Sequence, residues 1–76
     1  MSELEWIDIF GDNLAEMLDE ARMTQRDLAD AAGLSESSIS RYINKEMAPS
    51  FKAIINISYA LDCSVDDLID FGDMII

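Results

Sequence analysis

The stretch that decides the fold is Thr24 to Asn44, TQRDLADAAGLSESSISRYIN. Thr24 can cap a helix, and Asp27 three residues later completes a capping box and places an acid at the positive helix end. Three apolar residues then share one face at helical spacing: Leu28, Ala29 and Ala32. Gly33 follows them where a helix end needs a residue in the left-handed region. The sequence therefore predicts a short helix that stops at Gly33.

A second short helix is predicted directly after this turn. Ser35 can cap it, which leaves a connection of about three residues, the length expected of a helix-turn-helix unit. Such a short turn forces the helices to cross steeply, so their contact needs a small residue, Ala29, and a branched one, Ile39. Leu34 and Tyr42 complete the predicted shared core. The polar residues left over have no structural duty and are free to contact another molecule: Glu36, Ser37, Ser40 and Arg41.

These residues resemble the helix-turn-helix domains of phage repressors and their bacterial relatives, the lambda-repressor-like or Xre-type regulators. The resemblance rests on Thr24-Gln25, Leu28-Ala29, Ala32-Gly33-Leu34-Ser35, Ser38-Ile39-Ser40-Arg41 and Pro49-Ser50, and continues in Leu61, Ser64 and Asp67-Leu68. It covers about four fifths of the chain, which is far more specific than an isolated motif. The resemblance implies an all-α fold, a compact five-helix lambda-repressor-like helix-turn-helix domain.

Length and composition agree with one small domain over residues 1–76, with an acidic leader at 1–5 and an apolar tail at 71–76. A domain of 76 residues is marginal unless its core packs well or it oligomerises. The single Cys63 excludes an intrachain disulfide, and no charged-then-apolar leader precedes a cleavage site. No apolar run approaches the roughly 20 residues of a membrane helix. We therefore expect a cytoplasmic protein that does not contact the membrane.

The charge distribution is unusual for a protein that grips phosphates. The net charge is −11, whereas such proteins are usually basic. All 5 basic residues lie between positions 22 and 52, where they are opposed by Asp27, Asp30, Glu36 and Glu46. The helix-turn-helix segment is therefore nearly neutral, and its flanks are acidic.

The flanking sequence predicts three more helices. The first begins near Trp6, or after the helix-weakening Gly11, with an apolar stripe of Ile7, Phe10, Leu14, Met17, Leu18 and Ala21. Trp6 and Ile9 either cover an edge of the domain or join a partner subunit. Ser50 caps a fourth helix with one face formed by Phe51, Ile54, Ile55, Ser58 and Leu61. Ser64 and Asp67 form a second capping box for a short fifth helix that contains Val65, Leu68 and Ile69.

Two turns depart from the family pattern. Arg22 stands where many relatives carry a helix-ending Gly, so this turn is expected to be less relaxed. Lys45 also replaces a usual Gly. Because Asn tolerates the left-handed region best among non-Gly residues, we expect Asn44 to take over that turn.

The resemblance implies that a recognition helix at about 36–43 enters the major groove of double-stranded DNA. The expected base contacts are Glu36, Ser37, Ser40 and Arg41, and the expected backbone contacts are Gln25, Ser38, Asn44 and Lys45. Arg41 could bind a guanine in bidentate fashion. The alternatives for Arg41 are a phosphate contact or a pair with a helical neighbour.

With so few cations a monomer should bind DNA weakly, so we expect a homodimer on a palindromic operator. The resemblance therefore implies that the protein is a repressor-like transcriptional regulator. The apolar tail, Phe71 to Ile76, either packs on the first helix or joins the dimer contact.

Other function classes remain to be weighed. The acidic flanks favour an alternative, a protein-interaction module of the antitoxin or anti-repressor kind with a basic protein partner. An enzyme is not expected, because the chain has no His and Cys63 reads as a core thiol. The spacing of Asp62, Ser64, Asp66, Asp70 and Asp73 resembles a calcium loop. Asp67 replaces its required Gly, however, so we expect a capped helix and neither a metal nor a cofactor.

Overall fold

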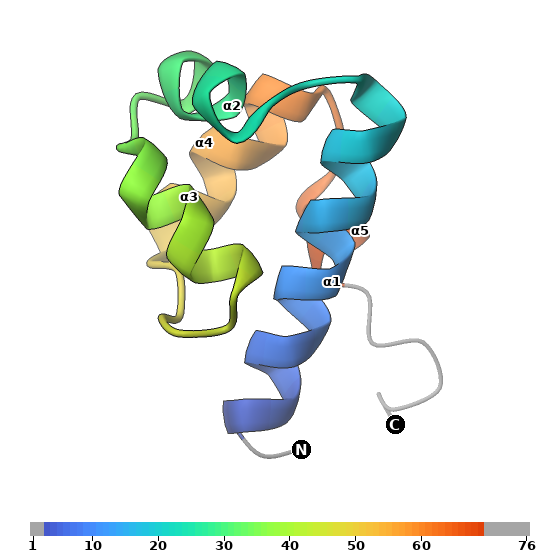
Figure 1. The fold of residues 1–76 in the computed structure, drawn as a ribbon. Helices are drawn as coiled ribbons and strands as arrows, with labels where there is room; N and C mark the ends of the chain where they lie inside the picture. The colour runs from blue at the N-terminus through green and yellow to red at the C-terminus, as the bar shows by residue number, and fades with distance from the viewer. Residues whose placement is uncertain (1–2, 70–76) are drawn as a thin grey trace.

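The structure of the protein, a computed structural model, describes residues 3–69. Within that range it has five helices and no strand: α1 (Glu3–Ala21), α2 (Gln25–Ala32), α3 (Glu36–Ile43), α4 (Phe51–Leu61) and α5 (Val65–Leu68) (Figure 1). The predicted all-α five-helix architecture is confirmed. The predicted packing of the tail at 71–76 lies outside the described residues. In the described range no helix combines the length and apolar character needed to span a membrane.

Helix α1 is longer than the sequence predicts. It begins at Glu3, inside the expected leader at 1–5, and runs through Gly11 without a break. The prediction of a start near Trp6 or after Gly11 is therefore wrong. Gly11 is buried against the end of α3, so packing of α1 on α3 outweighs the low helix propensity of glycine.

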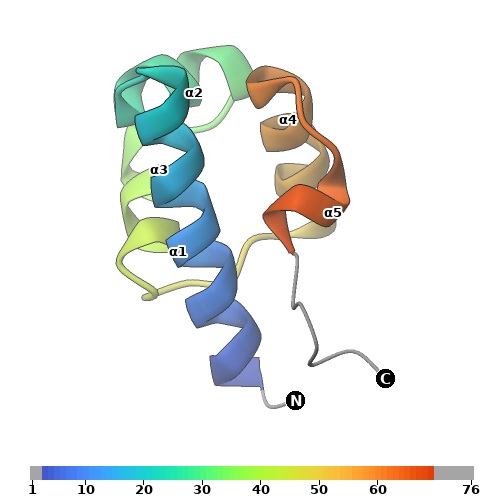
Figure 2. The ribbon, with the colours of Figure 1, turned by 90° about the vertical axis from the view of Figure 1, so that its right-hand side faces the viewer.

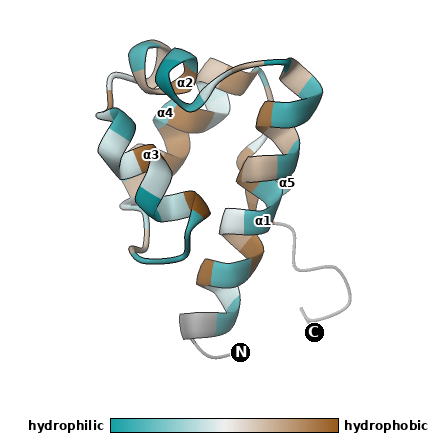
Figure 3. Cartoon of the chain, in the orientation of Figure 1, coloured by the Kyte–Doolittle hydropathy of each residue, from teal (hydrophilic) through white to brown (hydrophobic). Residues whose placement is uncertain are grey.

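All five helices contribute to one core. Its buried apolar members are Phe10, Leu14, Leu18, Leu28, Ala29, Ala32, Ile39, Tyr42, Ala53, Ile54, Ile57 and Leu68. In Figure 3 hydrophobic segments of α1 and α3 lie on the sides of these helices that face each other. Trp6 packs against this core, with its ring centroid 6.4 Å from that of Phe10 in an edge-to-face arrangement, so it covers an edge of the domain. Ala21, expected in the apolar stripe, is exposed.

The predicted apolar face of α4 is confirmed in part, because Ile54 and Ser58 are buried as expected. The side chains that α4 buries are Ala53, Ile54, Ile57 and Ser58. Phe51, predicted to lie in the core, is 75% exposed, and Ile55 and Leu61 are half-buried. The prediction was wrong for Phe51 and left out Ala53 and Ile57. Apolar residues at helical spacing occur on two faces of α4, and the packing against α2 and α5 selects between them.

The capping predictions are confirmed. Asp27 N donates to Thr24 Oγ1 at 3.0 Å, and Thr24 N donates to Asp27 Oδ2 at 3.0 Å. Ser64 and Asp67 form the second capping box, with both hydrogen bonds 3.2 Å long. Asn13 Nδ2 donates to the carbonyl oxygen of Leu68 at 2.9 Å and so ties α5 to α1. In Figure 2 α4 and α5 lie together on one side of the molecule, and α1 and α3 lie on the other.

Within residues 3–69, three helix ends place a non-glycine residue in the left-handed region. Arg22 has φ 56°, which confirms the less relaxed turn expected there, and Asp62 has φ 53°. Lys45 has φ 64°, whereas Asn44 has φ −79°. The expectation that Asn44 would take the left-handed turn is therefore wrong. Asn44 N still donates to Ser40 O at 2.9 Å as part of the last helical turn, so the reversal falls one residue later.

Candidate nucleic-acid interface

The α2–α3 unit has the predicted construction. Ser35 caps α3 by accepting a hydrogen bond from Ser38 N at 3.0 Å. Between the helices Gly33 adopts φ 68°, and Leu34 N donates to Ala29 O at 2.9 Å. Ala29 and Ile39 are buried, as the steep crossing requires. The core side of α3 is therefore fixed to α2, and its opposite side faces solvent.

The solvent side of α3 brings the predicted base-contacting residues together. Glu36, Ser37 and Arg41 are exposed, and Ser40 is half-buried beside them. In the part of the chain that the structure describes, the Arg41 guanidinium forms no ion pair. The alternative in which Arg41 is occupied by a charged helical neighbour is therefore disfavoured. All five of its N–H donors can reach a partner outside the protein.

Hydrogen bonds along α3 distinguish the Ser38 hydroxyl from the Ser40 hydroxyl. Ser38 receives a hydrogen bond on its Oγ from Ser35 Oγ at 2.9 Å, so this hydroxyl is already engaged at the helix start. Asn44 Nδ2 lies 3.4 Å from Ser40 Oγ, a long contact. The Ser40 hydroxyl thus keeps more freedom to donate or accept at a base edge than the Ser38 hydroxyl does.

Lys45 lies just beyond α3 and contacts α1. Its Nζ is 2.7 Å from Asp12 Oδ1. The hydrogen bond to the Asp12 carboxylate, with the charges of Asp12 and Asp8, raises the pKa of Lys45, so the ammonium stays charged at neutral pH. Because both side chains are well exposed, this ion pair is weak enough for a phosphate to compete for Lys45.

The start of α2 carries Gln25, another of the residues predicted to contact the DNA backbone. Gln25 is the first residue of α2 and is half-buried. Hydrogen bonds from the Thr24 backbone and hydroxyl lower the pKa of Asp27, so a carboxylate charge remains close to this helix start. Arg26, exposed and without an ion pair within residues 5–69, adds a cation next to Gln25. Arg26 is not among the site residues predicted from the sequence, and its position beside Gln25 is the signal that could have identified it.

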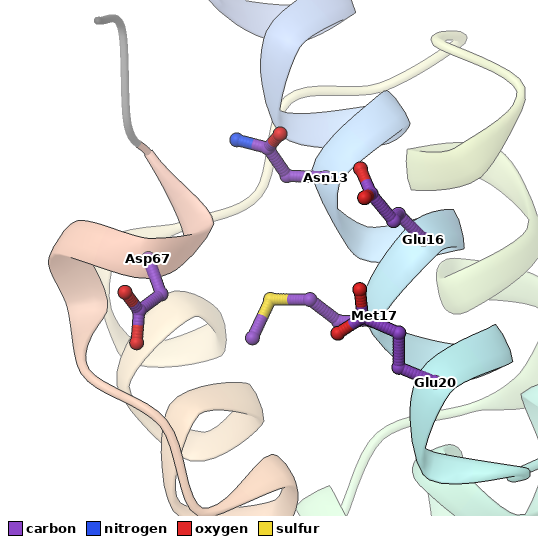
Figure 4. A pocket seen from close by; sticks show the side chains of 5 residues that line it. All are labelled: Asn13, Glu16, Met17, Glu20 and Asp67. Carbon is purple, nitrogen blue, oxygen red and sulfur yellow. The ribbon is translucent and has the colours of Figure 1, made fainter.

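A hollow of about 300 Å³ lies between α1 and α5, away from α3 (Figure 4). It is lined by Asn13, Glu16, Met17, Glu20 and Asp67. Its three carboxylates would repel a phosphate, so it is not part of a DNA interface. No group of side chains suited to holding a metal ion occurs among the described residues. Asp70 and Asp73 of the calcium-like pattern lie outside that range.

Cys63 offers little nucleophilic reactivity. The thiol is half-buried and packs against the core. Burial raises the pKa of Cys63, and the charges of Asp67 and Asp62 raise it further. The thiol therefore stays protonated at neutral pH, and the thiolate is the reactive form.

Comparison with known proteins agrees with this geometry. Residues 13–73 match the family model described as the Cro/C1-type HTH DNA-binding domain. The chain is also similar to the uncharacterized HTH-type transcriptional regulator YqaE of Bacillus subtilis (strain 168), with 33% identity over 61 residues. The matched region is 80% of this chain and 53% of YqaE, so the chain spans about half the length of that curated relative.

Two solved structures share the fold. One is the restriction-modification controller protein C.AhdI from Aeromonas hydrophila, with a TM-score of 0.79 and 26% identity over 82% of this chain and 94% of that chain. The other is the clp gene regulator ClgR from C. glutamicum, with a TM-score of 0.82 and 23% identity, covering 100% of this chain and 99% of the other. At that identity the second likeness concerns the fold alone.

Proposed function

The chain belongs to the Cro/C1-type HTH DNA-binding domain family, and from this premise we propose that it is a transcriptional regulator that binds duplex DNA sequence-specifically through α3. The observation that carries the proposal is the outer face of α3. Exposed Glu36, Ser37 and Arg41 lie together on a helix whose other side is fixed to α2. The fold, family and relatives are those of transcription regulators and not of enzymes.

Each predicted contact then has a chemical role. Arg41 donates to the O6 and N7 atoms of a guanine in the major groove, which is worth roughly 1–3 kcal/mol of discrimination. Ser37 and Ser40 donate or accept at neighbouring base edges, and Glu36 accepts from a cytosine amine. Gln25, Ser38, Asn44 and Lys45 contact the phosphate backbone and set the position of α3 in the groove. Arg26 joins them as a further phosphate contact.

We further propose that the protein acts as a dimer and represses by occupying a palindromic operator. The chain has 5 basic residues, so one protomer neutralises few phosphates and binds weakly. Two recognition helices about 34 Å apart on successive major grooves double the contacts. A two-fold protein requires a two-fold DNA site, which accounts for the palindrome.

The test is selection of bound fragments from a pool of random duplex DNA at two salt concentrations, followed by sequencing. Wild type should enrich a palindrome, and enrichment should fall steeply at the higher salt. Arg41→Ala should lose the preference at one base position in each half-site. Arg22→Gln, a matched loss of one exposed cation just past the end of α1, should keep the preferred sequence. Absence of any enriched sequence at low salt would overturn the proposal.

A second candidate function is favoured by the outer surface of α1. Among the described residues, its exposed acids form one ion pair, that of Asp12 with Lys45: Asp8, Asp12, Glu16, Asp19 and Glu20. Such a surface suits a basic protein partner better than it suits DNA. In that case a pool of DNA would yield no enriched sequence, and Arg41→Ala would leave binding to the protein partner unchanged.

A further inference from the structure

Helix α4 exposes an apolar stripe that the core does not use. Phe51 is 75% exposed and Tyr59 is 82% exposed, and they are the exposed large hydrophobic residues of the described chain. Ile55, half-buried, lies one helical turn from each of them. We call Phe51, Ile55 and Tyr59 the α4 stripe. A row of one aliphatic and two aromatic side chains at i, i+4 and i+8, with both aromatic rings exposed, is typical of a contact surface rather than of a solvated helix.

The same helix is the least charged part of the surface. Lys52 is the one charged residue within α4, Phe51–Leu61, in a chain whose net charge is −11. Two copies of such an acidic chain repel each other wherever α1 faces α1, because α1 exposes its carboxylates. Two copies that meet through their α4 helices repel each other least. A second copy is thus the occupant that fits the stripe, whereas a basic partner would gain more at α1.

We propose that the α4 stripe is the surface on which a second copy of this chain docks, with the two α4 helices antiparallel about a two-fold axis. A two-fold contact is self-complementary, so Phe51 of one protomer lies near Tyr59 of the partner subunit. Lys52, at the start of α4, then lies near Asp62 of the partner subunit, just past the end of its α4. Opposite charges therefore meet at both ends of the contact.

The size of the contact is consistent with a modest dimer. Each aromatic side chain buries about 150–250 Å² when covered. Four rings, already one fifth to one quarter covered, supply roughly half of the approximately 1,200 Å² of a small stable interface, and the residues beside them supply the remainder. α3 stays available, because α4 and α3 lie on different sides of the molecule (Figure 2). This inference rests on the proposed function, because the α4 contact would provide the two-fold axis that a palindromic DNA site requires.

The test is sedimentation equilibrium of the full chain from about 1 to 100 μM in low and high salt. Wild type should form a dimer, and higher salt should strengthen it by screening the repulsion between acidic copies. The double variant F51S/Y59S should weaken association at least tenfold. Ile9→Ser, a matched loss of one partly exposed apolar side chain on α1, should leave it unchanged. Circular dichroism verifies the fold of each variant. Substitution of these exposed side chains should leave the fold unchanged.

A pair of charge-reversal substitutions tests the predicted contact between Lys52 and Asp62 of the partner subunit. Lys52→Glu should weaken the dimer because it faces Asp62 of the partner subunit, and adding Asp62→Lys should restore it. A monomeric wild type at 100 μM, or a folded F51S/Y59S protein that dimerises as wild type does, would overturn the inference. Binding of a single half-site separates the two proposals. F51S/Y59S should keep the Arg41-dependent base preference there, so a loss of dimerisation with intact half-site recognition leaves the DNA proposal standing.

Discussion

A Cβ atom on Gly11 would lie 2.7 Å from the carbonyl oxygen of Tyr42, so the missing side chain at residue 11 sets how closely α1 approaches the end of α3. The same imagined atom would lie 3.3 Å from the carbonyl oxygen of Ile43. Next to this contact the Phe10 and Tyr42 rings pack edge to face, with their centroids 5.9 Å apart. Gly11 therefore positions the proposed recognition helix against the rest of the domain.

Gly11→Ala should destabilise the protein although alanine is the better helix former. Alanine gains about 1 kcal/mol of helix propensity, but a backbone carbonyl at 2.7 Å cannot move without shifting α3. Overpacking of this kind costs typically 1–3 kcal/mol. We expect a net loss of roughly 1 kcal/mol in the free energy of unfolding, measured by urea denaturation followed by circular dichroism.

The control for this substitution is Ala15→Gly, at an exposed position of the same helix. It changes helix propensity alone and should cost about 1 kcal/mol. If Gly11→Ala were as stable as wild type, the contact with Tyr42 would not constrain the packing of α1 on α3.

The features predicted correctly from sequence are those with local causes. Thr24, Ser35, Ser50 and Ser64 each cap a helix, and each accepts from a backbone N–H three residues later. The left-handed Gly33 has an equally local cause, because only the residue after a helix end must reverse the chain. Helix order and the exposed face of α3 follow from these boundaries and from the apolar periodicity.

The features missed depend on contacts between distant segments. No pattern near Gly11 reveals that Tyr42 approaches it, so the sequence predicts a start of α1 later than the observed one. The stripe of α4 that is buried is chosen by α2 and α5, not by α4 itself. In the candidate site, the pairing of Lys45 with Asp12 joins the turn after α3 to α1 and could not be deduced from either segment.

The Thr24–Asp27 capping box should make stability depend on acid. Hydrogen bonds from Thr24 hold the pKa of Asp27 below its ordinary value of 3.8 in the folded state. A carboxyl group whose pKa is lowered by folding adds stability above its unfolded pKa, and that stability is lost as pH falls through the folded pKa. We therefore expect stability to decline as the pH drops below about 3.8. Urea unfolding measured from pH 7 down to pH 3 would show it.

Asp27→Asn separates this contribution from general acid effects. Asparagine keeps an oxygen that can accept from Thr24 N but does not titrate. The variant should therefore lose less stability between pH 5 and pH 3 than wild type does. Asp30→Asn removes an exposed carboxylate of the same helix outside the capping box, and it should keep the wild-type slope. Equal slopes for Asp27→Asn and wild type would contradict the role given to the box.

The Asp12–Lys45 pair should restrain DNA binding, because Asp12 holds the ammonium of Lys45 that a phosphate would take. Asp12→Asn should raise the affinity for an operator roughly two- to fivefold, the range that a surface ion pair is worth. Lys45→Met should reduce the salt slope of binding by about one, and in that background Asp12→Asn should no longer help. Fluorescence anisotropy with labelled duplex at several salt concentrations measures both effects. A gain from Asp19→Asn, elsewhere on α1, as large as that from Asp12→Asn would mean that net charge alone is responsible.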